Sequence, residues 1–206
     1  MDEINAHIRS LLDCCCCALM QGKPVCHKAI DSRILLVGQA PGPREESFGK
    51  FFAWTAGKTL FSWFREYASV GEDDFRDKVF IAAVCRCFPG KASGGGDRVP
   101  DRQEIENCSV WLREELSILR PQLIIPVGKL AIAQFITPQK LDEMIGQKFS
   151  AEHPQEARRC DVIPLPHPSG ASPWHRKEAG KKLIQQAMKK IVAHPAWLET
   201  FNHPPR

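Results

Sequence analysis

The sequence has no apolar run that approaches the ~20 residues needed to span a bilayer, so we expect no membrane segment. Its first residues, Met-Asp-Glu, lack the basic and then apolar pattern of a secretory signal, which predicts a cytoplasmic protein. A strong excess of one charge is also missing, because the net charge is only +4. No internal repeat or domain boundary is visible, so residues 1–206 predict a single domain.

The cysteines do not form a pattern typical of disulfides, because an odd number, nine, occurs in a chain that we expect in a reducing compartment. Cys14 and Cys17 have the Cys-x-x-Cys spacing with which two thiolates grip one metal centre. Cys87 and Cys108 flank a later loop and could approach the same point. Four thiolates hold either a four-iron, four-sulfur cluster or one zinc ion. Which cysteines of the run 14–17 bind the metal stays open, because Cys15 or Cys16 could take the place of Cys14 or Cys17.

Apolar runs and helical spacing predict strands that alternate with helices, which implies right-handed crossovers and a mainly parallel sheet. Asp101 is a candidate N-cap, with Glu104 three residues later. We expect the cysteine-rich segment 1–30 to pack on the domain, and residues 195–206 to form a C-terminal tail. The predicted strands are 34–37, 79–84, 122–127 and 162–165, and the predicted helices are 4–13, 55–68, 101–119, 129–135 and 178–193.

Two loops that follow buried strands carry the residue types of a binding site. Residues 38–42 (Gly-Gln-Ala-Pro-Gly) follow the first strand, and 167–170 (His-Pro-Ser-Gly) follow the last. Loops at the carboxyl ends of parallel strands converge on one crevice, so these two predict two walls of a single site. The basic stretch 176–190 lies close to the second loop, where it could meet a phosphate backbone or form a solvated helix face.

Taken in order, the motifs resemble those of the uracil-DNA glycosylase superfamily, most closely its iron–sulfur-containing family 4. The matching motifs are Cys14-x-x-Cys17, Gly-Gln-Ala-Pro-Gly at 38–42, Gly-Lys-Phe-Phe at 49–52, Ala-Gly-Lys at 56–58, Cys-Phe-Pro at 87–89, Glu-Ile-Glu-Asn-Cys at 104–108, Leu-Arg-Pro at 119–121, Val-Gly at 127–128 and His-Pro-Ser at 167–169. The resemblance implies a three-layer α/β/α fold with a four-stranded, mainly parallel sheet. It also implies a monofunctional DNA-repair glycosylase, which flips uracil out of DNA, hydrolyses the N-glycosidic bond and leaves an abasic site.

The same resemblance implies roles for individual residues. His167 matches the histidine that donates to a uracil carbonyl oxygen as the glycosidic bond breaks, and Phe52 matches the aromatic that stacks on uracil. Gln39 occupies the place of the residue that positions the attacking water. The other implied contacts are Gly38, Ala40, Gly42 and Ala83 for uracil, Ser169, Gly170, Ser172, Trp174, His175 and Arg176 for DNA, and Cys14, Cys17, Cys87 and Cys108 for a [4Fe–4S] cluster, with zinc as the alternative.

Two departures from the family leave alternatives open. Family 4 has a glutamate where this chain has Gln39, and glutamine can orient water but cannot accept its proton. Ala83 replaces the asparagine that reads the uracil edge. Glu45 and Glu46 follow the first loop and are alternative carboxylates, or solvated loop charges. A protein that binds uracil or abasic DNA with weak turnover, or a glycosylase for hypoxanthine or xanthine, therefore remains open. We expect a monomer.

Overall fold

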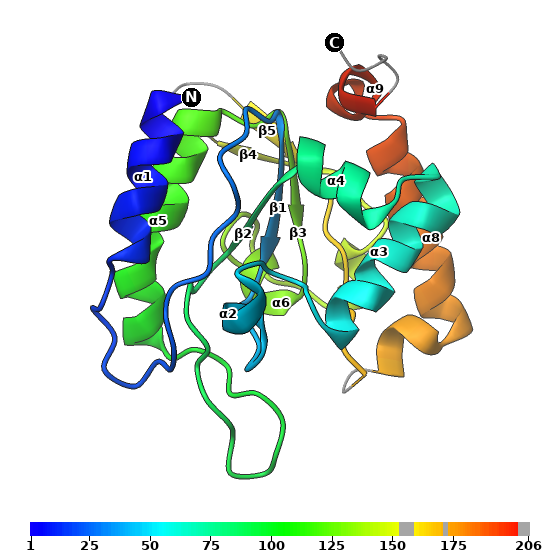
Figure 1. The fold of residues 1–206 in the computed structure, drawn as a ribbon. Coiled ribbons are helices and arrows are strands. Elements are labelled where there is room, and N and C mark those ends of the chain that lie inside the picture. Colours follow the sequence, from blue (N-terminus) through cyan, green and yellow to red (C-terminus); the bar gives the residue numbers. More distant parts are fainter. Residues whose placement is uncertain (153–158, 171–172, 202–206) are drawn as a thin grey trace.

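The computed structural model describes residues 1–152, 159–170 and 173–201 (Figure 1). Five strands within this part of the chain form a sheet in the order β2-β1-β3-β5-β4. The first four strands of that order are parallel, and β4 pairs antiparallel with β5. The strands are β1 (Ile34–Gly38), β2 (Phe80–Ala83), β3 (Leu123–Pro126), β4 (Phe149–Glu152) and β5 (Arg159–Val162).

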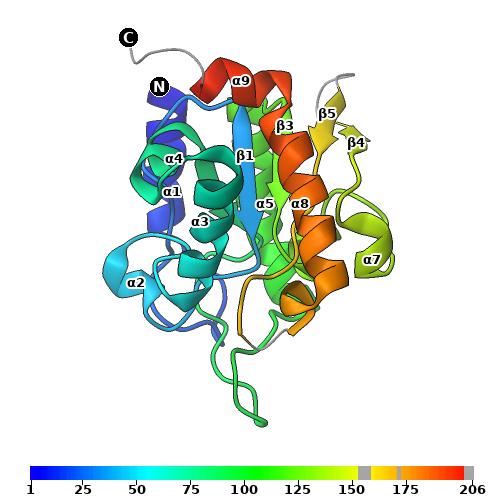
Figure 2. The ribbon, with the colours of Figure 1, turned by 90° about the vertical axis from the view of Figure 1, so that its right-hand side faces the viewer.

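Helices cover both faces of the sheet, which makes three layers (Figure 1). Alternate residues of β1 point to opposite faces: Leu35 packs in the core beneath α1 and α5, and Leu36 in the core beneath α3 and α8. The first layer holds α1 (Asp2–Leu12), α5 (Arg102–Leu119) and α6 (Lys129–Ile132), and the second holds α3 (Thr55–Ala68), α4 (Glu72–Lys78), α8 (Glu178–Val192) and α9 (Pro195–Phe201). Figure 2 shows α3 and α8 side by side in front of the sheet. The predicted α/β/α architecture is confirmed.

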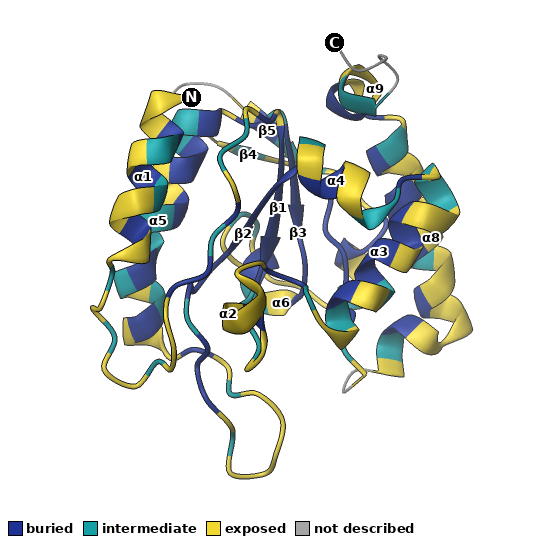
Figure 3. Cartoon of the chain, in the orientation of Figure 1, coloured by how far each residue is buried: buried dark blue, intermediate teal, exposed yellow. Residues whose placement is uncertain are grey.

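Burial explains why the central strands are easy to recognise in the sequence. All residues of β1, β2 and β3 are buried, and Figure 3 shows these strands enclosed by helices that are exposed on their outer sides. A parallel sheet covered on both faces requires such continuous apolar runs. Three further short helical segments are α2 (Glu45–Phe48), α7 (Leu141–Met144) and the 3-10 helix η1 (Pro173–Arg176).

Two predicted helices are confirmed at their ends. Helix α3 spans the predicted residues 55–68. Helix α5 begins after Asp101, whose side chain accepts from the Glu104 backbone while the Glu104 carboxylate accepts from the Asp101 backbone. This capping box is a local interaction, so the sequence alone can specify it. Every helix in the described ranges is too short or too polar to traverse a bilayer.

Three predictions about the sheet and the C-terminus need correction. The sheet has five strands rather than four, because the edge strand β4 (Phe-Ser-Ala-Glu) is only half apolar. The strand predicted at 162–165 lies earlier, as β5, and Leu165 keeps only a single bridge to Val127. The predicted tail begins with α9, in which the buried Trp197 stacks on Phe64 at a ring-centroid distance of 5.6 Å. Pro195, the first residue of the predicted tail, is the first residue of α9, a position that suits proline.

Candidate active site

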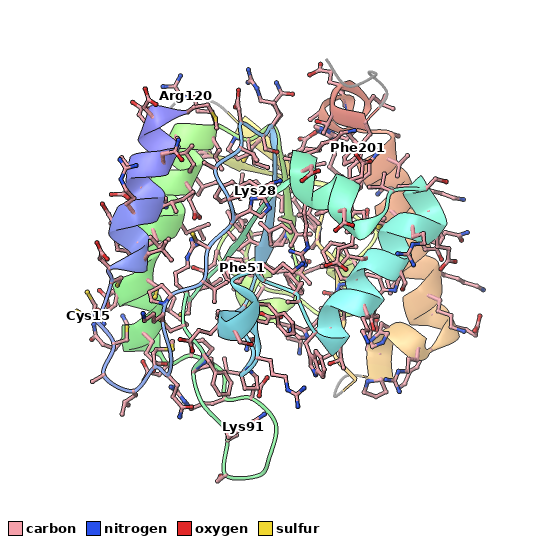
Figure 4. All side chains as sticks on the ribbon, in the orientation of Figure 1. Cys15, Lys28, Phe51, Lys91, Arg120 and Phe201 are labelled. Atoms are coloured by element: carbon pink, nitrogen blue, oxygen red, sulfur yellow. The ribbon has the colours of Figure 1, made fainter. Side chains whose placement is uncertain are left out.

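A cavity of about 420 Å³ opens at the carboxyl ends of the parallel strands. The loop between β2 and α5, which carries Lys91 in Figure 4, extends furthest from these strand ends in Figures 1 and 2. The sequence predicted that the loops after the first and last strands form two walls of one site, and they do. The cavity is lined by Gly38, Gln39, Ala40, Gly42, Phe52, Ala83, His167 and Ser169, together with residues that the sequence did not single out.

The aromatic wall of the cavity is held in a strained backbone conformation. Phe52 has a φ of 54°, in the left-handed region, which costs a non-glycine residue about 1–3 kcal/mol. Its carbonyl oxygen accepts a hydrogen bond of 3.1 Å from Nη2 of the buried Arg76. Gly57 packs against the same carbonyl, since a Cβ at position 57 would lie 1.7 Å from that oxygen. Gly38 leaves room for the ring, because a Cβ there would lie 2.9 Å from the ring edge.

Arg76 is itself fixed on both sides. Its Nε donates to Glu72 at 2.9 Å, and its guanidinium carbon lies 4.6 Å from the ring centroid of Phe61. Helix α4 therefore supports Phe52 from behind the cavity.

Glu45 joins two walls of the cavity. One carboxylate oxygen accepts from the backbone N–H of Gly42 at 3.2 Å, and the other accepts from that of Ala53 at 3.1 Å. Burial raises the pKa of Glu45 to about 6, against the lowering effect of these two donors. Of the two carboxylates proposed as replacements for the missing glutamate, Glu45 lines this cavity, whereas Glu46 is exposed and lines a separate hollow.

The opposite wall presents His167 as a neutral donor. Burial lowers the pKa of its imidazole below the usual 6.5, so the ring is neutral at pH 7. The backbone N–H of Ser169 donates to His167 Nδ1 at 3.2 Å, which makes Nδ1 an acceptor and places the ring proton on Nε2. Gly128, with a φ of 88°, packs against the other side of the ring.

Two residues that line the cavity, Lys91 and Asp97, lie in the glycine-rich loop between β2 and α5, and they were not identified from the sequence as site residues. Lys91 donates to an Asp97 carboxylate oxygen at 2.6 Å, and the two residues also form a backbone bridge. The other oxygen of Asp97 faces Gly42, where a Cβ would lie 3.8 Å away. The charge of Asp97 partly opposes the fall in the pKa of His167. The only signal in the sequence was the polar side chains themselves, in a segment that its glycines and prolines mark as a loop.

The second loop places some predicted DNA-binding residues at the surface and others inside. Gly170 and Arg176 are exposed, and the Arg176 guanidinium lies near Gly170, since a Cβ there would be 3.2 Å from Nη2. Ser172 lies outside the described residues. Ser169 lines the cavity, next to the exposed part of the loop.

Trp174 and His175, also predicted to contact DNA, are engaged within the protein. The Trp174 indole N–H donates to Asp142 at 2.7 Å, and its ring packs against the core. His175 is buried, with its ring edge-on to Trp63 at 5.9 Å. Both side chains therefore have partners within the protein. No local pattern predicts these contacts, because the partners come from distant segments.

The cysteines predicted to bind a cluster line a second cavity, also of about 420 Å³. Its walls include Cys14, Cys17, Cys87 and Cys108. Asn107 donates to the Cys17 sulfur at 3.5 Å. Within the described residues, no three His, Cys, Asp or Glu side chains are gathered as closely as a single metal ion requires.

Cys85 is a buried neighbour of this cavity that the prediction left out. Its thiol forms a hydrogen bond with Cys108, which lowers the pKa of Cys108 to about 6 with help from Arg86. The cysteine run 14–17 is partly at the surface, where Figure 4 labels Cys15.

A buried ion pair anchors the wall of this cavity. Arg86 makes two hydrogen bonds with the fully buried Glu115, of 2.9 and 2.6 Å. Burial is the largest single effect and opposes ionisation of Glu115, but the charge and hydrogen bonds of Arg86, together with His7, outweigh it and hold the pKa of Glu115 below its usual value. His7 of α1 bonds with Glu114 at 2.8 Å, so α1 and α5 are joined beside the cysteines.

Comparison with known proteins places this geometry in a family context. The family model "Uracil DNA glycosylase superfamily" matches residues 27–192. The chain is 32% identical over 178 residues to the Type-4 uracil-DNA glycosylase of Archaeoglobus fulgidus, covering 82% of this chain and 83% of that protein. It is 27% identical over 167 residues to the Type-4 uracil-DNA glycosylase of Sulfurisphaera tokodaii, covering 78% and 69%. A Type-5 uracil-DNA glycosylase of Pyrobaculum aerophilum is 32% identical over 112 residues, covering 50% and 47%.

Proposed function

The chain belongs to the uracil-DNA glycosylase superfamily, and from this premise we propose that it excises uracil from DNA in base-excision repair. The reaction is hydrolysis of the N-glycosidic bond, which leaves an abasic site. The observation that carries the proposal is the cavity shared by Phe52, the loop 38–42 and His167. A base inside a duplex stack cannot reach such a cavity, so the nucleotide must be extruded.

The proposed chemistry starts with departure of the base. The Phe52 ring stacks on uracil, and Nε2–H of His167 donates to the carbonyl oxygen on which negative charge develops. Because His167 is neutral and fixed by Ser169 and Gly128, the donor is preorganised. Loss of one such donor costs about 10²–10³ in rate.

Water attack requires a group that orients the water and one that takes its proton. We assign the first task to Gln39 and the second to Glu45, both of which line the cavity. With a pKa raised to about 6, Glu45 is ionised at pH 7 and basic enough to act near neutrality. Each of its oxygens keeps a lone pair beyond its backbone contact.

Single-turnover excision by Glu45→Gln and Glu46→Gln tests this assignment with a matched pair. We expect E45Q to lose about 10²–10⁴ in rate, a typical contribution of a general base, and E46Q to match wild type. Asp97→Asn is the competing variant, because Asp97 also lines the cavity. If D97N loses the excision rate while E45Q keeps it, Asp97 and not Glu45 is the general base.

Ala83 lines the cavity, and its side chain has no polar group that could read uracil. This observation favours, as a second candidate, a protein that binds uracil or abasic DNA with weak turnover, or one that excises hypoxanthine or xanthine. The test is release of free base by the wild-type protein from oligonucleotides that contain uracil, hypoxanthine, xanthine or no lesion. Uracil release above the others supports the proposal, whereas tight lesion binding without release supports the second candidate.

We propose a [4Fe–4S] cluster held by Cys14, Cys17, Cys87 and Cys108, which line the same cavity. Four thiolates can also hold one zinc ion, which is the alternative occupant. The cluster would be structural, since it would fasten the N-terminal segment to the loop before α5.

Iron content and melting temperature of Cys87→Ser and the surface variant Cys15→Ser test the ligand set. C87S should lose iron and stability together, and C15S should keep both. Iron loss in C15S would show that Cys15 is a ligand in place of a neighbouring cysteine. Iron loss in C87S without a change in melting temperature would contradict a structural role. A monomer in the cytoplasm, where thiols stay reduced, is part of the same proposal.

A further inference from the structure

An exposed aromatic pair with two cations lies at the rim of the proposed uracil cavity. Phe48 and Trp54 are 49% and 41% exposed, unusually open for such large apolar side chains, and their rings stack at a centroid distance of 6.3 Å and an interplanar angle of 21°. The Arg44 guanidinium carbon lies 4.3 Å from the Trp54 ring centroid, and Lys58 Nζ lies 5.8 Å from it. We call these four residues the Trp54 platform.

The platform is continuous with the cavity. Arg44 and Trp54 line the cavity together with Phe52. Phe48 ends α2, and Lys58 lies in the first turn of α3. Figures 1 and 2 place α2 and the start of α3 beside each other at the carboxyl end of the sheet.

We propose that the Trp54 platform stacks an unpaired base next to the target nucleotide and thereby makes single-stranded DNA the preferred substrate. Aromatic rings flanked by cations are the recurring means of binding single strands without reading sequence. Phe48 and Trp54 lie nearly parallel, and the Arg44 guanidinium lies over the Trp54 ring, so an incoming base extends the stack on Phe48 or takes the place of the guanidinium on Trp54. Bases within a duplex already stack on each other, so an intact duplex offers no free base face.

Charge supports the same occupant. Arg44, Lys50 and Lys58 are exposed along this stretch, while the carboxylate of Glu45 is turned into the protein. The exposed cations suit the phosphates on either side of a stacked base. Glu46 is the exposed acid in this stretch, and it lines a different hollow.

The inference rests on the proposed function but can be tested without it. We would measure the dissociation constants of uracil-free single-stranded and duplex oligonucleotides for the wild-type protein, Trp54→Ala, Phe48→Ala and Trp54→Phe. Leu198→Ala is the matched control, because Leu198 is 40% exposed on α9, at the opposite end of the molecule.

Loss of one base–aromatic stack should weaken single-strand binding by W54A about 5- to 150-fold. Duplex binding by W54A should stay within about twofold of wild type, and W54F, which keeps a ring, should recover most of the single-strand affinity. F48A should weaken single-strand binding as well, and L198A should leave both constants unchanged. An equal loss on both forms of DNA, or no loss in W54A and F48A, would overturn the platform.

Excision assays separate this proposal from the proposed function. If wild type releases uracil and W54A keeps the wild-type ratio of single-strand to duplex rates, the platform fails while the glycosylase assignment stands. If wild type releases no uracil, and W54A binds single-stranded DNA more weakly than wild type, the platform stands while the glycosylase assignment fails.

Discussion

Replacement of Arg76 by methionine tests whether a residue in α4 sets the position of the proposed stacking ring. Arg76 donates to the Phe52 carbonyl from a buried guanidinium, and a hydrogen bond from a charged group contributes about 1.5–3 kcal/mol to stability. Methionine fills similar space but cannot donate, so the carbonyl is left unpaired in a left-handed backbone that is already strained. We expect the free energy of unfolding of Arg76→Met to fall by about that amount.

The expected effect of Arg76→Met on excision comes from displacement of the Phe52 ring. Base–aromatic stacking contributes about 1–3 kcal/mol, so complete loss of the Phe52 position lowers kcat/KM by up to about 150-fold. The assay is uracil release from a single-stranded oligonucleotide, with thermal unfolding measured on the same samples. Binding of uracil-free DNA should stay at the wild-type level, because in the proposed function Phe52 contacts only an extruded base.

Glu72→Gln provides the control. It removes the ion pair with Arg76 Nε and leaves the contact with Phe52. Glu72 is 34% exposed, so E72Q should lose less than about 1 kcal/mol and keep wild-type kcat/KM. A destabilised R76M that excises uracil with wild-type kcat/KM would refute the positioning role.

Three further predictions concern residues beside the two cavities. Gly57→Ala places a Cβ 1.7 Å from the Phe52 carbonyl oxygen, so the turn must open, and both melting temperature and excision should fall. The pKa of Glu45 is raised from 4.5 to about 6, so between pH 4.5 and pH 6 the folded protein binds more protons than the unfolded chain. The free energy of unfolding of wild type should therefore fall as the pH rises through this range. That fall, about 2 kcal/mol, should vanish in Glu45→Gln when denaturant unfolding is compared at both ends of the range. Arg86→Met strands the buried Glu115 carboxylate and should cost about 3–5 kcal/mol, and adding Glu115→Leu should recover most of the loss.

Features that depend on short-range interactions could be predicted from the sequence. The start of α5 follows from Asp101 and Glu104, which cap each other across one turn. Strands β1 and β3 are continuous apolar runs, because both of their faces are buried. Once a parallel sheet is expected, the loops that carry Gln39 and His167 must converge, and both line the same cavity.

Features that depend on distant partners could not be predicted. The contact between Arg76 and Phe52 joins residues 24 positions apart, and no local pattern marks Arg76 as its donor. The hydrogen bond between Trp174 and Asp142 joins residues 32 positions apart, and no local pattern marks Asp142 as the acceptor. Strand β4 was not predicted, because an edge strand needs only one apolar face. Its alternation of apolar and polar residues covers only four positions, which is too short to recognise.

In the proposed reaction, a neutral His167, held by the Ser169 backbone, drives departure of uracil in the cavity at the strand ends. The most direct measurement is the single-turnover rate of uracil release at pH 7 by wild type and His167→Ala, with binding of abasic DNA measured in parallel. We expect wild type to release uracil and H167A to be slower by about 10²–10³, with binding of abasic DNA retained. Equal rates in the two proteins, or no release by wild type, would contradict it.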